Sequence, residues 1–111
     1  MKQTVYLGDF RDAFKSMGRE NQFSYEGLGI LFDYLEQYEV DTGEAVELDV
    51  IAFCCDFSEM DVDEVIGHYG LEDEVEGMDE TEKHAFVSDY LNDHTVICGE
   101  VSPNGYVFQD F

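Results

Sequence analysis

The clearest pattern of apolar and polar positions lies in the first half of the chain. Leu28, Leu31 and Leu35 recur at three- and four-residue steps, which places them on one face of a helix. Ser24 is a suitable N-cap, because its side-chain oxygen can accept a backbone N–H of the first turn. The spacing therefore predicts a helix from about Ser24 to Asp41.

Three shorter stretches combine apolar helical spacing with start and stop signals. Asp61 with Glu64, and Asp79 with Glu82, have the spacing of an N-cap and the third helical residue. The predicted short helices run from Phe10 to Met17, from Val62 to Tyr69, and from Asp79 to about Asn92.

Other segments have the composition of strands. Residues 46–54 alternate at first and then become continuously apolar, which predicts a strand that starts near a sheet edge and ends buried on both faces. Residues 95–101 and 106–109 are rich in β-formers on either side of Ser-Pro-Asn-Gly, which predicts a hairpin. Residues 3–7 could add a short strand. The whole pattern predicts an α+β fold: a small antiparallel sheet of three to four strands, with the C-terminal hairpin, packed against about four helices.

The composition adds a strong excess of negative charge to this predicted fold. At 111 residues with 44% apolar and 14% aromatic residues, residues 1–111 are expected to form one globular domain and not an acidic tail. The chain has 27 Asp and Glu but only five Lys and Arg, a formal net charge of -22, and no Lys or Arg between Glu20 and Glu82. Charge of one sign destabilises a compact state by self-repulsion, so we expect it to serve an outside partner.

Charge and cysteine usage narrow the function classes. The excess of acid disfavours direct binding to nucleic acid or to an anionic membrane and favours a basic protein partner. No apolar signal segment or stretch of ~18 apolar residues is present, and the cysteine number is odd, so a cytoplasmic protein with reduced thiols is expected. The sequence leaves the oligomeric state open.

Catalytic and metal-binding patterns are weak. His68, His84 and His94 lack a nucleophile at a recognisable spacing, and no phosphate-binding or dinucleotide-binding loop occurs, so no enzyme activity and no cofactor are expected. Asp61-Val62-Asp63 resembles the start of a calcium loop, but Val65 and Ile66 occupy places that need an oxygen ligand and a glycine. No metal site is predicted.

A distributed acidic surface is the stronger candidate. Carboxylates three or four residues apart on a helix lie about 5–6 Å apart, whereas double-stranded DNA carries one charge per ~1.7 Å. A face of such carboxylates could meet a Lys- and Arg-lined groove as phosphate does, with help from exposed aromatics such as Tyr25, Tyr34, Tyr69 and Phe111. The predicted partner-binding residues are Glu26, Asp33, Glu36, Glu39, Asp61, Asp63, Glu64, Glu72, Asp73, Glu74, Glu76, Asp79 and Glu80.

In size and charge the chain resembles the small acidic DNA-mimic inhibitors of phages and mobile elements, of the anti-CRISPR and antirestriction type. The segment from Ser24 through Glu59, including Glu47-Leu48-Asp49-Val50-Ile51-Ala52-Phe53-Cys54-Cys55-Asp56-Phe57, is also similar to small uncharacterised phage and plasmid proteins. The resemblance implies a stoichiometric inhibitor, in a bacterial host cytoplasm, of a CRISPR effector or, second, of a restriction enzyme. It carries over no catalytic residues.

Two alternatives remain open. An acidic adaptor or regulatory protein could bind another basic protein without imitating DNA. Salt adaptation could also explain acidity, although halophilic surfaces lose lysine over the whole molecule, whereas here the basic residues gather at residues 2–19 and Lys83.

Overall fold

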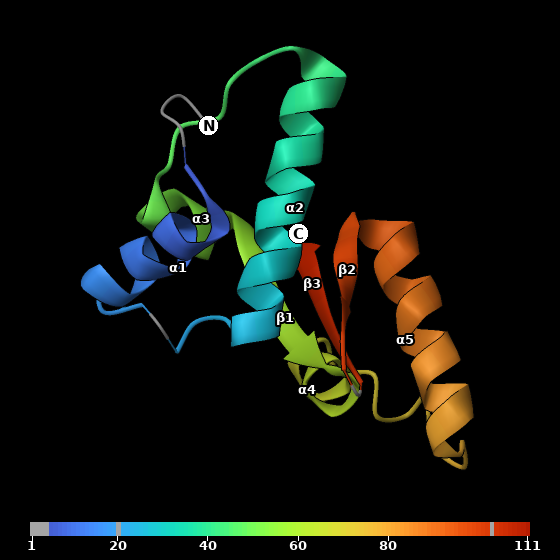
Figure 1. Ribbon diagram of the computed structural model, residues 1–111. Coiled ribbons are helices and arrows are strands. Elements are labelled where there is room, and N and C mark those ends of the chain that lie inside the picture. Colours follow the sequence, from blue (N-terminus) through green and yellow to red (C-terminus); the bar gives the residue numbers. More distant parts are fainter. Residues whose placement is uncertain (1–4, 20, 103) are drawn as a thin grey trace.

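The computed structural model describes residues 5–19, 21–102 and 104–111, and it has an α+β fold (Figure 1). Five helices and three strands lie within these ranges. In chain order they are α1 (Leu7–Ser16), α2 (Tyr25–Thr42), α3 (Val50–Asp56), β1 (Phe57–Asp61), α4 (Val62–His68), α5 (Glu80–His94), β2 (Ile97–Val101) and β3 (Gly105–Gln109).

The three strands form an antiparallel sheet in the order β1-β3-β2, so the last strand lies in the middle. β3 pairs with β1 from Phe57 opposite Gln109 to Asp61 opposite Gly105. It also pairs with β2, where the register shifts between Ile97 and Gly99. The predicted C-terminal hairpin is confirmed, and its partner on the other side is a strand that directly precedes α4.

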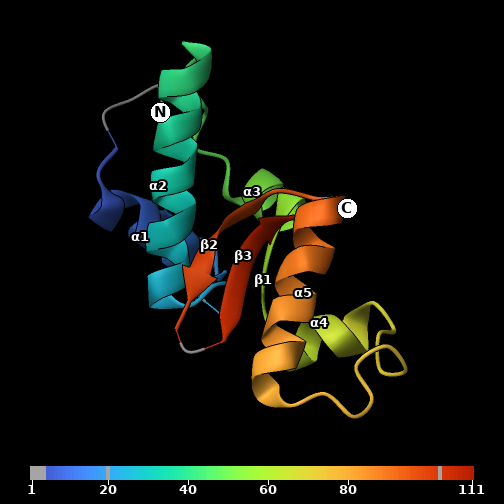
Figure 2. The ribbon, with the colours of Figure 1, turned by 90° about the vertical axis from the view of Figure 1, so that its right-hand side faces the viewer.

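Helices cover both faces of the sheet (Figures 1 and 2). Val107 of β3 belongs to a hydrophobic cluster with α1, α2 and α3. Its neighbours Tyr106 and Phe108 point the other way, into a cluster with α4 and α5. Because alternate residues of one strand belong to the two clusters, β3 is buried on both faces and joins the helical layers.

The long helix and its signals are confirmed. The Ser24 side chain accepts the N–H of Gly27 at 2.9 Å and caps α2, while Gly43 ends the helix in the left-handed conformation with φ 70°. Leu28, Leu31 and Leu35 are buried as their spacing predicts. The short helices are also confirmed, although α1 begins three residues before the predicted Phe10 and α5 extends to His94.

The predicted strand over residues 46–54 is wrong. Residues 44–49 have no regular structure and α3 occupies Val50–Asp56, because Asp49 accepts the N–H of Ala52 at 3.1 Å and caps a helix there. Val50 and Phe53 are buried three residues apart while Ile51 is 41% exposed, which is a helical and not an alternating pattern.

The other predicted strand, over residues 3–7, is also not observed in its described part. Val5 and Tyr6 have no regular structure, and Leu7 is the first residue of α1. The Asp9 carboxylate accepts the N–H of Tyr6 at 3.1 Å where the helix starts, which leaves no residues for a strand. Residues 3 and 4 lie outside the described ranges.

A close approach in the sheet gives a stability prediction. A Cβ added at Gly99 would lie 2.6 Å from Cγ2 of Ile30, which packs on the sheet from α2. We expect Gly99→Ala to lower the free energy of unfolding by about 1–3 kcal/mol through overpacking. Gly67→Ala is the control, because no atom lies within 4 Å of a Cβ built there, near the end of α4. Urea unfolding followed by circular dichroism measures the free energy of unfolding of both variants. A Gly99→Ala protein as stable as the wild type would contradict the prediction.

Candidate functional site

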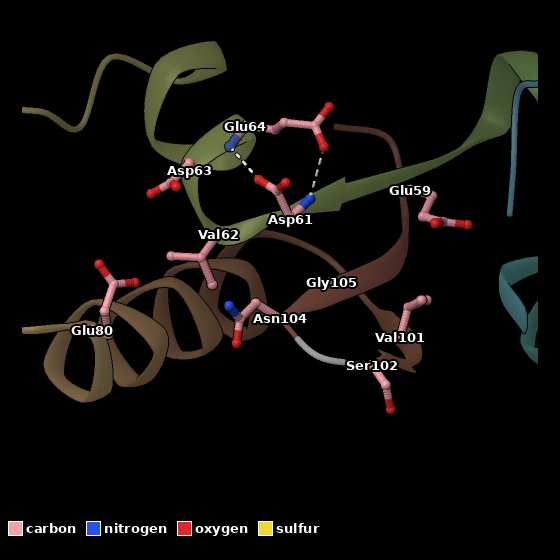
Figure 3. A pocket seen from close by; sticks show the side chains of 10 residues that line it. All are labelled: Glu59, Asp61, Val62, Asp63, Glu64, Glu80, Val101, Ser102, Asn104 and Gly105. Atoms are coloured by element: carbon pink, nitrogen blue, oxygen red, sulfur yellow. Dashed lines mark hydrogen bonds between the residues drawn. The ribbon is translucent and has the colours of Figure 1, made fainter.

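Several of the predicted partner-binding carboxylates gather at one end of the sheet, around a hollow of about 270 Å³. Four of them, Asp61, Asp63, Glu64 and Glu80, line it together with Glu59, which sequence analysis did not single out. We call this the acidic hollow. In Figure 3, Asp63 and Glu80 lie on one side of it and Glu59 on the other. Residues from β1, α4 and α5 thus bring five carboxylates around one concave surface.

Some of these carboxylates also hold the local structure. Asp61 accepts the N–H of Glu64 at 2.8 Å, and Glu64 accepts the N–H of Asp61 at 3.2 Å, so the pair forms the predicted capping box of α4 (Figure 3). Asp79 caps α5 by accepting the N–H of Glu82 at 2.8 Å. Within the described ranges Asp63 and Glu80 cap no helix, so their carboxylates are not engaged in holding these helix starts.

Glu59 and Glu26 tie the start of α2 to the same end of the sheet. Glu59 accepts both the N–H and the hydroxyl of Ser24, at 2.8 and 3.0 Å. Glu26 accepts the N–H of Ser102, a residue that lines the acidic hollow, at 3.2 Å. The predicted residue Glu26 therefore lies beside the hollow, held there by a contact that spans 76 residues of sequence.

A second hollow, of about 310 Å³, continues the acidic surface. It shares Asp63 with the first and adds Glu72 and Glu76, which follow α4 in the acidic turn at residues 72–77. Asp73 and Glu74 are exposed in the same turn. The lining of the second hollow also includes Ile66, Val75, Met78 and Lys83. The two hollows together place carboxylates from β1 to the start of α5 on one connected surface.

The remaining predicted residues are not part of this surface. Asp33, Glu36 and Glu39 follow Glu26 along α2 and line neither hollow. A rise of 1.5 Å per residue puts Glu39 about 20 Å along the helix from Glu26. Glu36 and Glu39 are half-buried, and Glu39 accepts the N–H of Val46 at 2.7 Å. The helical acids thus extend away from the hollows.

The aromatic candidates have separate surroundings. Tyr25 is 76% exposed, whereas Tyr34 is half-buried against Phe57. Tyr69 stacks on Phe111 with ring centres 4.7 Å apart, in a group that also contains Tyr90 and His94. Sequence analysis named Tyr69 and Phe111 separately but not their contact, because the two residues lie 42 positions apart in the chain.

Comparisons with protein families, with curated proteins and with solved structures found no match for this chain. Within the described ranges, no group of three or more His, Cys, Asp or Glu side chains is placed to hold a metal ion. None of the helices in these ranges is long and apolar enough to cross a membrane. The electrostatic geometry is therefore the principal guide to function.

His84, Tyr106 and Cys98 are titratable residues that line neither hollow. His84 lies 3.4 Å from Glu100, and its ring contacts the buried Tyr106, whose hydroxyl bonds to Ser88 at 2.6 Å. Burial raises the pKa of the Cys98 thiol to about 12. A thiolate nucleophile needs the opposite shift.

The three thiols differ enough in environment to give a reactivity prediction. Cys55 is exposed, Cys54 is half-buried with a pKa raised by burial, and Cys98 has its pKa raised to about 12. Because the thiolate is the reacting form, iodoacetamide at about pH 8 should modify Cys55 first and Cys98 last. Mass spectrometry of tryptic and Glu-C peptides over time measures the order. Equal rates for Cys55 and Cys98 in the folded protein, with the urea-unfolded chain as control, would contradict the assigned burial.

Proposed function

We propose that this protein is a stoichiometric inhibitor of a nucleic-acid-binding defence enzyme, a CRISPR effector first and a restriction enzyme second, in the cytoplasm of a bacterial host. The inhibitor acts without catalysis and without a cofactor. Its connected carboxylate surface occupies the enzyme's basic groove and excludes DNA.

The connected acidic surface is the observation that carries this proposal. The acidic hollow contains five carboxylates, and the second hollow adds two more through the shared Asp63. Lys83 is the one Lys or Arg among the residues that line them. A basic groove that binds phosphate attracts such a surface at long range and raises the association rate.

A second candidate function has its own support. The second hollow places the apolar side chains of Ile66, Val75 and Met78 among the acids. A local patch with an apolar centre suits an acidic adaptor that binds another basic protein without imitating DNA. The two functions differ in whether DNA and the protein exclude each other.

Competition with DNA tests the proposal. The purified protein is immobilised and offered a CRISPR effector or a restriction enzyme, and the retained complex is challenged with target DNA. We expect capture at low salt, loss of capture at high salt, and displacement by DNA. Polyglutamate serves as the control for charge alone. Capture that DNA does not compete with would favour the adaptor, and no capture of any basic nucleic-acid enzyme would refute inhibition by mimicry.

Salt dependence of stability separates both candidates from salt adaptation. A net charge of -22 repels itself, and the Debye length falls from about 30 Å at 0.01 M to about 10 Å at 0.1 M salt. We therefore expect the melting temperature to rise steeply over this range and then to level off. Scanning calorimetry at increasing NaCl measures it. A chain that folds only in molar salt would instead indicate a halophilic protein.

A further inference from the structure

Two of the four Lys and Arg residues that the structure describes border a separate cavity, of about 450 Å³, between α1 and the start of α2. We call it the cationic cavity. Arg11 and Lys15 lie one helical turn apart on its α1 side, with Asp12 between them. The remaining lining residues are Gly8, Phe23, Tyr25 and Leu28. A cavity with two cations, one acid and an apolar wall is unusual in a chain of net charge -22.

Arg11 is held in place by uncharged groups. Its Nη2 donates to the carbonyl oxygen of Tyr25 at 2.9 Å, and its guanidinium carbon lies 3.4 Å from the centre of the Tyr25 ring. Gly29 faces the same nitrogen, and a Cβ there would lie 3.1 Å from it. These contacts fix the planar guanidinium without neutralising it.

The positive charge of the cationic cavity is compensated only in part by Asp12 among the described residues that line it. Neither Arg11 nor Lys15 forms an ion pair within the part of the chain that the structure describes. The Nε of Arg11 is buried and has no hydrogen-bond partner among the residues that the structure describes. An unsatisfied buried donor is costly, so an incoming acceptor would gain from pairing with it. The Tyr25 ring covers one face of the guanidinium and is itself 76% exposed.

We propose that the cationic cavity binds a carboxylate of a protein partner, carried next to an apolar or aromatic side chain. The planar fork of Arg11 fits a carboxylate in two-point contact, and Lys15 adds a second charge. Phe23 and Leu28 supply the apolar wall for the neighbouring side chain. This site does not rest on the inhibitor proposal, because it lies outside both acidic hollows.

A carboxylate suits the cavity better than a phosphate. Arg11, Lys15 and Asp12 give a net charge of +1, which matches a monoanion, whereas Asp12 would repel a phosphate dianion. A nucleic acid strand would also be repelled by the overall charge of -22. A single carboxylate on an otherwise neutral or basic surface meets much less repulsion.

Titration of the ¹⁵N-labelled protein with short peptides tests the site. The probes are acetyl-Ala-Phe with a free terminal carboxylate and acetyl-Phe-Glu-amide with a side-chain carboxylate, so the two arms distinguish the sources. The controls are acetyl-Ala-Phe-amide, acetyl-Phe-Gln-amide and inorganic phosphate. We expect saturable amide shifts in residues 8–15 and 23–28 with one or both carboxylate peptides, with a Kd of about 1 mM, and no saturation with the amide controls.

Variants decide whether the cavity is responsible. Lys15→Gln should weaken binding about two- to fivefold, as expected for an exposed ion pair, and Arg11→Lys about tenfold through loss of the fork. Arg19→Gln removes the same charge outside the cavity and should leave binding unchanged. The unbound spectra report whether each variant is folded. The proposal is overturned by tighter phosphate binding, by equal binding of the glutamine peptide, by equal loss in Arg19→Gln, or by no saturable shift at about 10 mM peptide.

Discussion

Reversing Asp63, Glu76 and Glu80 to lysine together should lower the affinity for a basic nucleic-acid enzyme at least ~100-fold, because each reversal replaces an attraction with a repulsion. An exposed ion pair contributes about 0.5–1 kcal/mol and its reversal costs about twice that, so three reversals amount to roughly 3–6 kcal/mol, where about 1.4 kcal/mol is a factor of ten in affinity. The three residues span both acidic hollows. Asp63→Ala alone should weaken binding only a few-fold. Competition against labelled target DNA measures the affinity.

A matched triple variant controls for net charge. Glu44, Asp89 and Asp93 are exposed and line neither hollow, so reversing them to lysine changes the charge equally at other places. It should reduce affinity far less. Asp63 and Glu80 lie in first helical turns, so the melting temperature of the first variant must be measured as well. Equal loss in both variants would mean that overall charge and not the hollows drives binding. A full loss from Asp63→Ala alone would point to a single specific pocket.

The largest expected effect on stability comes from Phe10→Ala. Phe10 is fully buried, and its ring centre lies 5.1 Å from that of Phe14, 5.3 Å from Phe32 and 5.9 Å from Phe53. Loss of a buried Phe costs about 3–5 kcal/mol, out of a total of roughly 5–15 kcal/mol for a domain of this size. The variant should therefore lose a large share of its free energy of unfolding, and it should be least stable at low salt, where charge repulsion is strongest. Urea unfolding followed by circular dichroism measures the change.

Met17→Ala is the control for this prediction, because Met17 ends the same helix and is 53% exposed. It should change the free energy of unfolding by less than about 1 kcal/mol. The wild-type transition should be a single step, since β3 belongs to both hydrophobic clusters. Two separate transitions, one of them insensitive to Phe10→Ala, would show that the two layers unfold independently.

Local signals predicted α1, α2, α4 and α5 but neither α3 nor β1. Ser24, Asp61 and Asp79 cap the helices that their positions indicate, because a capping bond depends only on residues a few places apart. The stretch Val50–Asp56 is apolar enough for a buried strand, and the deciding contact is the cap from Asp49. β1 was not predicted, since Phe57–Asp61 becomes a strand by pairing with β3, almost fifty residues away.

The candidate site was predictable only in part, because its residues are brought together by tertiary contacts. Composition identified the acids but not their neighbours in space. Asp63 and Glu80 line the same hollow because α4 and α5 cover the same face of the sheet, and Glu59 reaches this hollow from β1. No local pattern separates these acids from Glu39, which lies far along α2. The aromatic group around Phe111 likewise depends on tertiary contacts.

The central position of β3 has a consequence for synthesis in the cell. Val107, Tyr106 and Phe108 complete both hydrophobic clusters, yet they follow every helix in the chain. Neither layer can close until this strand leaves the ribosome, so long-range pairing is the last step and the nascent chain exposes apolar side chains until then. The acidic residues of positions 20–82 emerge earlier, and their negative charge makes incomplete nascent chains repel one another. The same charge proposed to meet a basic groove thus protects the unfinished protein from aggregation.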